Sequence, residues 1–186
     1  MKKLFYFLLV MVTVSLLATS CNKDDEEDTV KTVKLGAQSN TTIPGFYSVS
    51  ENKTYTMDQG FQNQAAIDIF CFYEAETGNN IALASPGSNI TGIFTGSSSV
   101  ENWTTLNTTR FSATTLTVEQ FDAIVETDEL IVTAYDTANN YRKAKDLAID
   151  DIYAFKTQAA IQGILKVTEV VQGTDGSVTF EVKVKK

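Results

Sequence analysis

Acidic side chains are the residues of this sequence with the clearest potential for chemistry, because hydrolysis of a glycosidic bond needs only two carboxyl groups about 5–10 Å apart. The candidates are Asp122, Glu126, Asp128, Glu129, Asp150 and Asp151. Asp150 and Asp151 are neighbours on an expected strand, where consecutive side chains point to opposite faces, so they cannot form such a pair. The other four lie on or after a predicted helix, where acidic side chains are ordinarily solvated. We therefore expect that the protein is not an enzyme.

Histidine is absent from the chain, and its absence excludes several kinds of site. A Ser-His-Asp or Cys-His catalytic arrangement cannot be built, and neither can a histidine-ligated zinc centre. The ten glycines are scattered among turns, without the spacing that holds phosphates or dinucleotides. The sequence therefore predicts no cofactor.

Calcium, which takes oxygen ligands, is the remaining option for a metal. Asp146, Asp150 and Asp151, or the turn around Asp175, could supply such ligands. The alternating Asp-x-Asp-x-Asp-Gly pattern that would make this site convincing is missing. We expect no metal site.

An aromatic ring in a polar segment is the best indication of a ligand site. Trp103 lies in a loop-like stretch with Asn102 and Asn107. An indole can stack on the apolar face of a sugar while amide groups bond its hydroxyls, so these three residues are the candidate glycan site. The alternative is that Trp103 fills the core or plugs an end of the fold, because its large apolar area favours burial.

The chain is acidic, with a formal net charge of −8. Nucleic acid is therefore an unfavourable partner, since binding to phosphates depends on Lys and Arg. One basic cluster stands out, formed by Arg142, Lys143 and Lys145 beside Tyr141. We interpret it as a solvated loop.

The N-terminus has the layout of a secretory signal. Lys2 and Lys3 precede an apolar run over residues 4–17, and small residues follow up to Ser20. The run is shorter than the ~20 residues that span a bilayer, and the residues after it are acidic rather than basic. We predict a signal peptide over residues 1–20 that is removed from the mature protein.

The residues at the end of this signal carry a family resemblance. Leu17-Ala18-Thr19-Ser20-Cys21 resembles a bacterial lipobox, although the strictest lipobox has leucine in place of Ala18. Cys21-Asn22-Lys23-Asp24-Asp25-Glu26 resembles the export signal of Bacteroidetes surface lipoproteins, and the rest of the chain resembles small β-rich lipoproteins of that group. The resemblance implies that Cys21 is acylated and anchors the protein to the outer membrane, exposed on the cell surface. It implies an acidic tether over residues 21–29 and supplies no catalytic or binding motif.

If Cys21 is acylated, Cys71 has no disulfide partner. It lies in a segment over residues 67–73 that is apolar on both alternating faces after Asp68, which is typical of a central strand covered on both sides. A buried thiol is the expectation, since no histidine is available to activate a nucleophile.

Residues 30–186 are expected to form a single domain in which β-strands predominate. Threonine and other β-branched residues recur, and turn clusters separate short apolar segments. Strands are predicted over residues 30–35, 47–50, 53–57, 66–73, 81–84, 90–94, 130–133, 149–155, 163–171 and 177–185. The fold predicted from this pattern is an antiparallel β-sandwich, immunoglobulin-like or jelly-roll-like, with one short helix; the alternative is a small β-barrel.

Two segments allow firmer predictions. Residues 163–185 form a hairpin whose last strand alternates apolar residues with Thr179, Glu181, Lys183 and Lys185, which should meet water. Residues 117–125 form a short amphipathic helix with a capping box, which we expect to plug an end or an edge of a sheet.

The expected function is a surface-anchored, non-enzymatic binding module for a glycan in a nutrient-uptake assembly. The alternative is a structural or adhesive subunit that binds a neighbouring protein through an unpaired strand edge.

Overall fold

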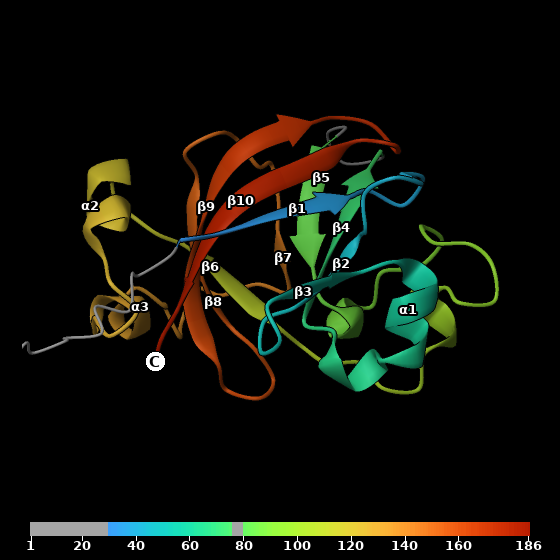
Figure 1. The fold of residues 1–186 in the computed structure, drawn as a ribbon, viewed down its shortest axis with the longest axis horizontal. Helices are drawn as coiled ribbons and strands as arrows, with labels where there is room; N and C mark the ends of the chain where they lie inside the picture. The colour runs from blue at the N-terminus through green and yellow to red at the C-terminus, as the bar shows by residue number, and fades with distance from the viewer. Residues whose placement is uncertain (1–29, 76–79) are drawn as a thin grey trace, which may run out of the picture.

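The computed structural model describes residues 30–75 and 80–186, which form two antiparallel sheets packed face to face (Figure 1). Sheet A has the strand order β1, β10, β9, β8, β6, and sheet B has the order β3, β2, β4, β5, β7. The strands of sheet A are β1 (Lys31–Gly36), β6 (Arg110–Ala113), β8 (Ile152–Lys156), β9 (Gln162–Val171) and β10 (Ser177–Val184). Those of sheet B are β2 (Phe46–Ser48), β3 (Lys53–Tyr55), β4 (Ile69–Glu74), β5 (Asn80–Ala84) and β7 (Lys143–Ala144). The predicted sandwich is confirmed, and the described strands do not close into a barrel.

The space between the sheets is filled by one face of each strand. The buried side chains here include Val33, Leu35, Tyr47, Ile69, Cys71, Leu83, Phe155, Leu165, Val167, Val178, Phe180 and Val182. The alternation predicted for β10 places its valines and phenylalanine in this cluster, because successive side chains of a strand point to opposite faces. This apolar layer joins the two sheets into one domain.

Both sheets are also covered on their outer faces. Over sheet B, Phe70 and Phe72 pack with Trp103 beneath α1 (Met57–Gln62). Over sheet A, Ile152 and Ile164 pack under α2 (Val118–Ala123) and α3 (Leu130–Thr133). Figure 1 shows α2 and α3 at one end of the molecule and α1 at the other. The described chain therefore contains three short α-helices rather than the one predicted, together with short 3-10 turns at Gln64–Ala66, Pro86–Ser88 and Val100–Asn102.

The predicted N-terminal cap of α2 is confirmed. Thr117 Oγ1 accepts from the backbone N–H of Gln120, and the Gln120 side chain accepts from the backbone N–H of Thr117. The expected position of the helix is wrong, because α2 lies over the outer face of sheet A and its Phe121 packs against that face. Lys183, predicted to meet water, is buried beneath α2 as a consequence.

Two predicted strands are wrong. Residues 130–133 form α3, in which the N–H groups of Val132 and Thr133 donate to the carbonyl oxygen of Glu129. Their β-branched side chains favour a strand locally, but the helix buries Ile131 against sheet A. Residues 90–94 form a loop whose apolar side chains pack on the outer face of sheet B. β6, β7 and α1 have no counterpart among the predicted elements, because each is short and its apolar pattern is interrupted.

The predicted signal peptide (residues 1–20), Cys21 and the tether (residues 21–29) lie outside the described residues. Across residues 30–75 and 80–186, no helix is long and apolar enough to cross a membrane. The lipid anchor therefore stays a prediction.

Candidate functional site

Trp103, the candidate sugar platform, is a core residue. Its side chain is only 5% exposed, and its ring lies 5.4 Å from the ring of Phe46 between the centroids. The indole Nε1 donates to the carbonyl oxygen of Ser98 at 2.9 Å. The alternative interpretation, in which Trp103 fills the core, is the one the structure supports, and no ring face is open to a sugar.

The two asparagines predicted to accompany Trp103 fix separate loops. Asn102 is exposed, and its Nδ2 donates to the carbonyl oxygens of Gly96 and Ser97 at 3.2 Å each. Asn107 is buried, and its Nδ2 donates to the carbonyl oxygens of Ala65 and Ile67. The structure therefore does not gather the three predicted residues on one exposed surface.

Three of the six acidic residues weighed for hydrolysis are engaged by lysines. Asp122 pairs with Lys166 at 2.6 Å, Glu126 with Lys186 at 2.7 Å and Glu129 with Lys185 at 2.9 Å. These ion pairs join α2, α3 and the turn between them to sheet A, which is a structural role. Within the described part of the chain, no three His, Cys, Asp or Glu residues are grouped so that they could hold a metal ion.

Cys71 is fully buried in the core between the sheets, as the sequence predicts. Burial raises the pKa of its thiol well above the usual range, although a hydrogen bond with the backbone of Val178 acts in the opposite direction. The reactive thiolate is therefore scarce at any physiological pH.

This burial predicts an unreactive thiol. In the native protein at pH 8, we expect iodoacetamide to alkylate Cys71 about 100-fold more slowly than in the urea-unfolded chain, because attack requires opening of the core. Mass spectrometry of the tryptic peptide that contains Cys71 measures both rates. Equal rates in the native and unfolded protein would contradict the burial described here.

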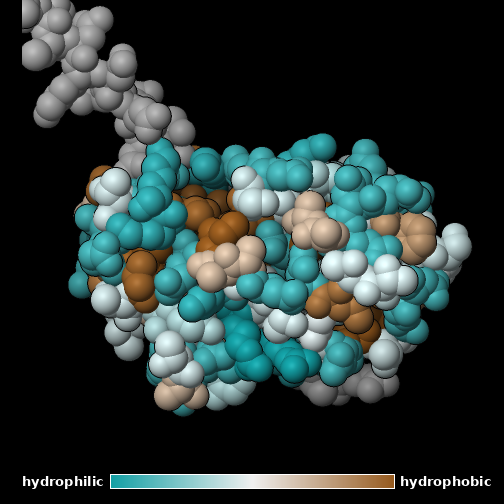
Figure 2. Space-filling view, turned by 90° about the horizontal axis from the view of Figure 1, so that it is seen from below, coloured by the Kyte–Doolittle hydropathy of each residue, from teal (hydrophilic) through white to brown (hydrophobic). Residues whose placement is uncertain are grey.

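The surface offers no single large apolar face on the side seen from below. Figure 2 shows the brown apolar side chains of that side in separate patches among teal and white ones. Scattered apolar residues of this kind are normal on a soluble domain and do not mark a site. A binding site on this protein is therefore better sought in a defined groove.

One groove combines aromatic and cationic side chains. It has a volume of about 470 Å³ and is lined by Phe111, Ala113, Tyr141, Arg142, Lys143, Lys145 and Tyr153; we name it the Tyr141 groove. It forms where the chain crosses from one sheet to the other. The backbone of Tyr141 pairs with that of Phe111 in β6, and Lys143 pairs with Ala84 in β5. The groove thus opens between the edges of the two sheets.

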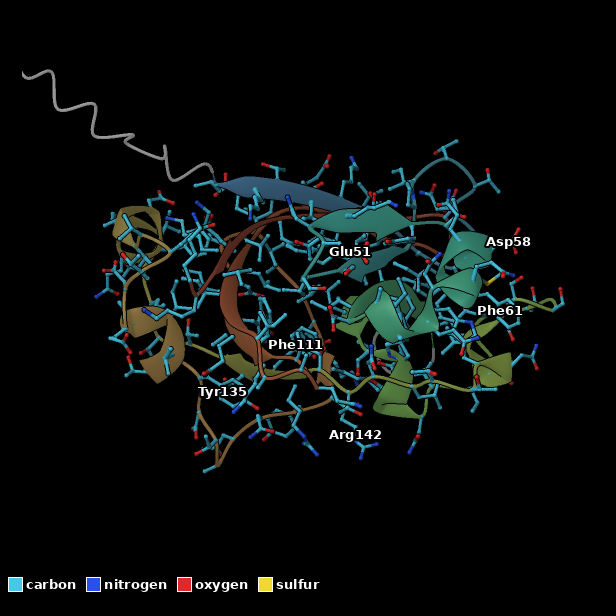
Figure 3. All side chains as sticks on the ribbon, turned by 60° about the horizontal axis from the view of Figure 1, so that its bottom comes forward. Glu51, Asp58, Phe61, Phe111, Tyr135 and Arg142 are labelled. Carbon is cyan, nitrogen blue, oxygen red and sulfur yellow. The ribbon has the colours of Figure 1, made fainter. Side chains whose placement is uncertain are left out.

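Several hydrogen bonds hold the groove in shape. The Tyr153 hydroxyl donates to the carbonyl oxygen of Lys145 at 3.1 Å, and Arg142 Nη1 donates to the carbonyl oxygen of Gly87 at 3.0 Å. Lys143 Nζ lies 2.7 Å from a carboxylate oxygen of Glu74. Figure 3 shows Phe111 near the middle of the molecule and Arg142 on its lower rim. These bonds tie the segment over residues 141–145 to β8 through Tyr153 and to β4 through Glu74.

Tyr141 is the exposed aromatic residue of the groove, with 65% of the residue accessible. Tyr153, half-buried beside it, keeps its proton, because burial and then the charges of Asp151 and Asp146 raise its pKa. The two phenol rings can stack on the apolar face of a sugar ring. The nearby cationic side chains can donate hydrogen bonds to the hydroxyl groups of that sugar. The solvated loop predicted for Tyr141 and the basic residues beside it agrees with the exposure of Tyr141 and Arg142. No signal in the sequence indicates that Phe111 and Tyr153 line the same groove.

Comparison with known proteins supports the fold and leaves the function open. No protein-family model and no curated protein matches this chain. Among solved structures, the chain is similar to a DUF4466 family protein from Parabacteroides merdae, with a TM-score of 0.55 and 16% identity, over 84% of this chain. The chain spans about half of that protein, 54% of its length. At this identity, the likeness shows a shared sandwich fold and assigns no role to the Tyr141 groove.

Proposed function

We propose that this protein is a lipid-anchored, non-enzymatic binding module that holds a glycan in the Tyr141 groove, outside the cell and within a nutrient-uptake assembly. The observation that carries the proposal is the exposed Tyr141 ring at the rim of a groove that also contains Tyr153. Because the backbone of Tyr141 is paired with β6, the ring is presented from a fixed position.

The chemistry of the groove suits a sugar. The apolar faces of pyranose rings stack on phenol rings, and their hydroxyl groups accept hydrogen bonds from guanidinium and ammonium groups. Arg142 and Lys145 stand beside the aromatic residues, and each is a donor without being an acceptor. None of the described residues that line the groove is a carboxylate, and the nearby Glu74 is paired with Lys143 and Lys145. This arrangement supports binding of a glycan without its hydrolysis.

The anchoring part of the proposal depends on the lipobox-like residues that end in Cys21. Two or three acyl chains hold a protein on a membrane, whereas one chain is marginal. Labelling of intact cells with a radioactive fatty acid, followed by replacement of Cys21 with serine, tests the anchor independently of any ligand. Loss of label in the Cys21→Ser variant supports the anchor.

Removal of the exposed ring should weaken glycan binding. We expect Tyr141→Ala to lower affinity about fivefold, because stacking of one ring contributes on the order of 1 kcal/mol. Tyr141→Phe should retain most of the affinity, since it keeps the ring. Affinity gels that contain plant, algal and host polysaccharides, followed by calorimetry on any polysaccharide that retards the protein, provide the measurement.

The matched control is Val125→Ala, which removes an exposed apolar side chain that does not line the groove. It should leave affinity unchanged, and all three variants should unfold at the same urea concentration as the parent. Failure of every polysaccharide to bind, or equal affinity for the parent and Tyr141→Ala, would overturn the glycan proposal.

A partner protein is the second candidate, favoured by the adjacent exposed side chains of Tyr141 and Arg142. Tyrosine and arginine are the residue types that contribute most to interface hot spots. Crosslinking on intact cells should then capture one protein with the parent and not with Arg142→Ala, while the polysaccharides show no binding. Capture of the same protein by both forms would contradict this candidate.

A further inference from the structure

A second cavity lies among loops, and it shares no lining residue with the Tyr141 groove. Its volume is about 290 Å³, and its lining contains Ser50, Asp68, Asn107 and Gln158 together with small apolar residues. Ser50 follows β2, and Gln158 lies in the turn between β8 and β9. The lining is therefore half polar and comes from loops and turns that flank strands of both sheets.

Asp68 is the single charged residue of this lining. It is 6% exposed, and the one hydrogen bond recorded for its carboxylate comes from the backbone N–H of Val49 to Oδ2, at 2.9 Å. Among the described residues, none of the ion pairs includes Asp68. A buried carboxylate without a cationic partner is costly, which makes this one an unusual feature of the fold.

The surroundings of Asp68 show the same lack of positive charge. Burial raises the pKa of the Asp68 carboxyl, and the Val49 N–H offsets only part of that effect. Tyr47 is buried nearby, and its hydroxyl donates to Asn52 Oδ1. Burial raises the pKa of Tyr47, and the negative charge of Asp68 raises it further, so Tyr47 is neutral. No cationic side chain compensates the carboxylate in the described structure.

The neighbouring amide is oriented so that it adds an acceptor. Both hydrogen bonds of Asn107 Nδ2 are made to backbone carbonyl oxygens, those of Ala65 and Ile67, at 2.8 and 3.0 Å. This fixes the amide group and leaves its Oδ1 available to a donor. Gln158 Oε1 accepts from the backbone N–H of Thr108, so the Gln158 side chain is also held in place.

We infer that this cavity, named here the Asp68 pocket, binds a primary ammonium group, with Asp68 as the counter-ion and Asn107 Oδ1 as a second acceptor. An ammonium group supplies the missing positive charge and three hydrogen-bond donors in one compact unit. A divalent cation fits less well, because calcium takes six to eight oxygen ligands and the lining provides one carboxylate. The group could come from a lysine side chain or from an amino sugar, which share this chemistry.

The NMR signal of the Val49 backbone amide should respond to binding at Asp68, because this amide donates directly to the Asp68 carboxylate. In two-dimensional NMR spectra of the purified protein, we expect a saturable shift of the Val49 signal on addition of Nα-acetyl-lysine methylamide or of glucosamine. The matched compounds without an ammonium group, Nα,Nε-diacetyl-lysine methylamide and N-acetylglucosamine, should produce none. A response to lysine alone identifies a protein as the source of the group, and a response to glucosamine alone identifies a glycan.

The Asp68→Asn variant should lose the response or bind at least tenfold more weakly, because the side-chain carbonyl can keep the Val49 bond while the charge is removed. Asp58→Asn, which removes an exposed carboxylate, is the matched control and should bind like the parent. Equal shifts with the charged and neutral compounds, or no Val49 shift with either charged compound, would overturn the inference. Both results are obtained with the parent protein, so they do not depend on folding of a variant, and neither bears on the Tyr141 groove.

Discussion

Replacement of Trp103 by alanine is expected to lower the free energy of unfolding by about 3–5 kcal/mol, the range for removing a buried large aromatic side chain. The ring contacts Phe46 and packs near Gly60 of α1, where an added Cβ would lie only 3.1 Å from the indole. The substitution also removes the donor that satisfies the carbonyl oxygen of Ser98. Urea unfolding followed by circular dichroism measures the loss, since the variant has no tryptophan fluorescence.

Two further variants make this prediction specific. Trp103→Phe keeps an apolar ring and loses the hydrogen bond to Ser98, so it should cost less than the alanine variant. Tyr141→Ala removes an aromatic ring from the surface and should change stability by less than about 0.5 kcal/mol. A Trp103→Ala protein as stable as the parent would show that the ring is not packed as described.

Lys183→Met is expected to cost about 3 kcal/mol, because it leaves buried carbonyl oxygens without their charged donor. Lys183 is 5% exposed, and its Nζ lies within 3.0 Å of three carbonyl oxygens, those of Phe121, Asp122 and Ile124. The ammonium also lies 4.9 Å from the centre of the Phe121 ring. These groups belong to the C-terminal end of α2, where a cation is favoured by the helix dipole.

The matched control for Lys183 is Lys34→Met on β1. The Lys34 side chain is 43% exposed and pairs with Glu169 at 2.8 Å, and an exposed pair of this kind contributes about 0–1 kcal/mol. Methionine keeps the aliphatic stem in both variants, so the comparison isolates the ammonium group. Hydrogen exchange should show that Lys183→Met loosens α2 first. Similar losses in the two variants would contradict the docking role of Lys183.

Local patterns in the sequence were sufficient for much of the fold. The alternation along residues 177–185 predicts β10, and the apolar run around Cys71 predicts a strand buried on both faces, because the side-chain period of a strand is two residues. The capping box at Thr117 predicts where α2 begins, since it depends on residues three positions apart. Each of these features is decided by neighbours along the chain.

Burial of particular side chains could not be predicted in the same way. Trp103 lies in a polar stretch, and its burial follows from the approach of α1 and Phe46, which are more than forty residues earlier in the chain. Lys183 follows the pattern of a water-facing residue, and only the placement of α2 over sheet A covers it. Residues 130–133 have the composition of a strand, yet packing of Ile131 against sheet A favours a helix.

The candidate sites show the same division. Composition and short-range periodicity were enough to predict a β-rich domain, the buried thiol, the acidic charge and the absence of histidine chemistry, and the strand order of the structure then distinguished the sandwich from the barrel. The tertiary structure was needed to show that Tyr141, Phe111 and Tyr153 line one groove. It was also needed to show that Asp68 and Asn107 line one pocket. Each site is assembled from strands and loops distant in sequence, and the register and crossing of two sheets set which of their side chains meet.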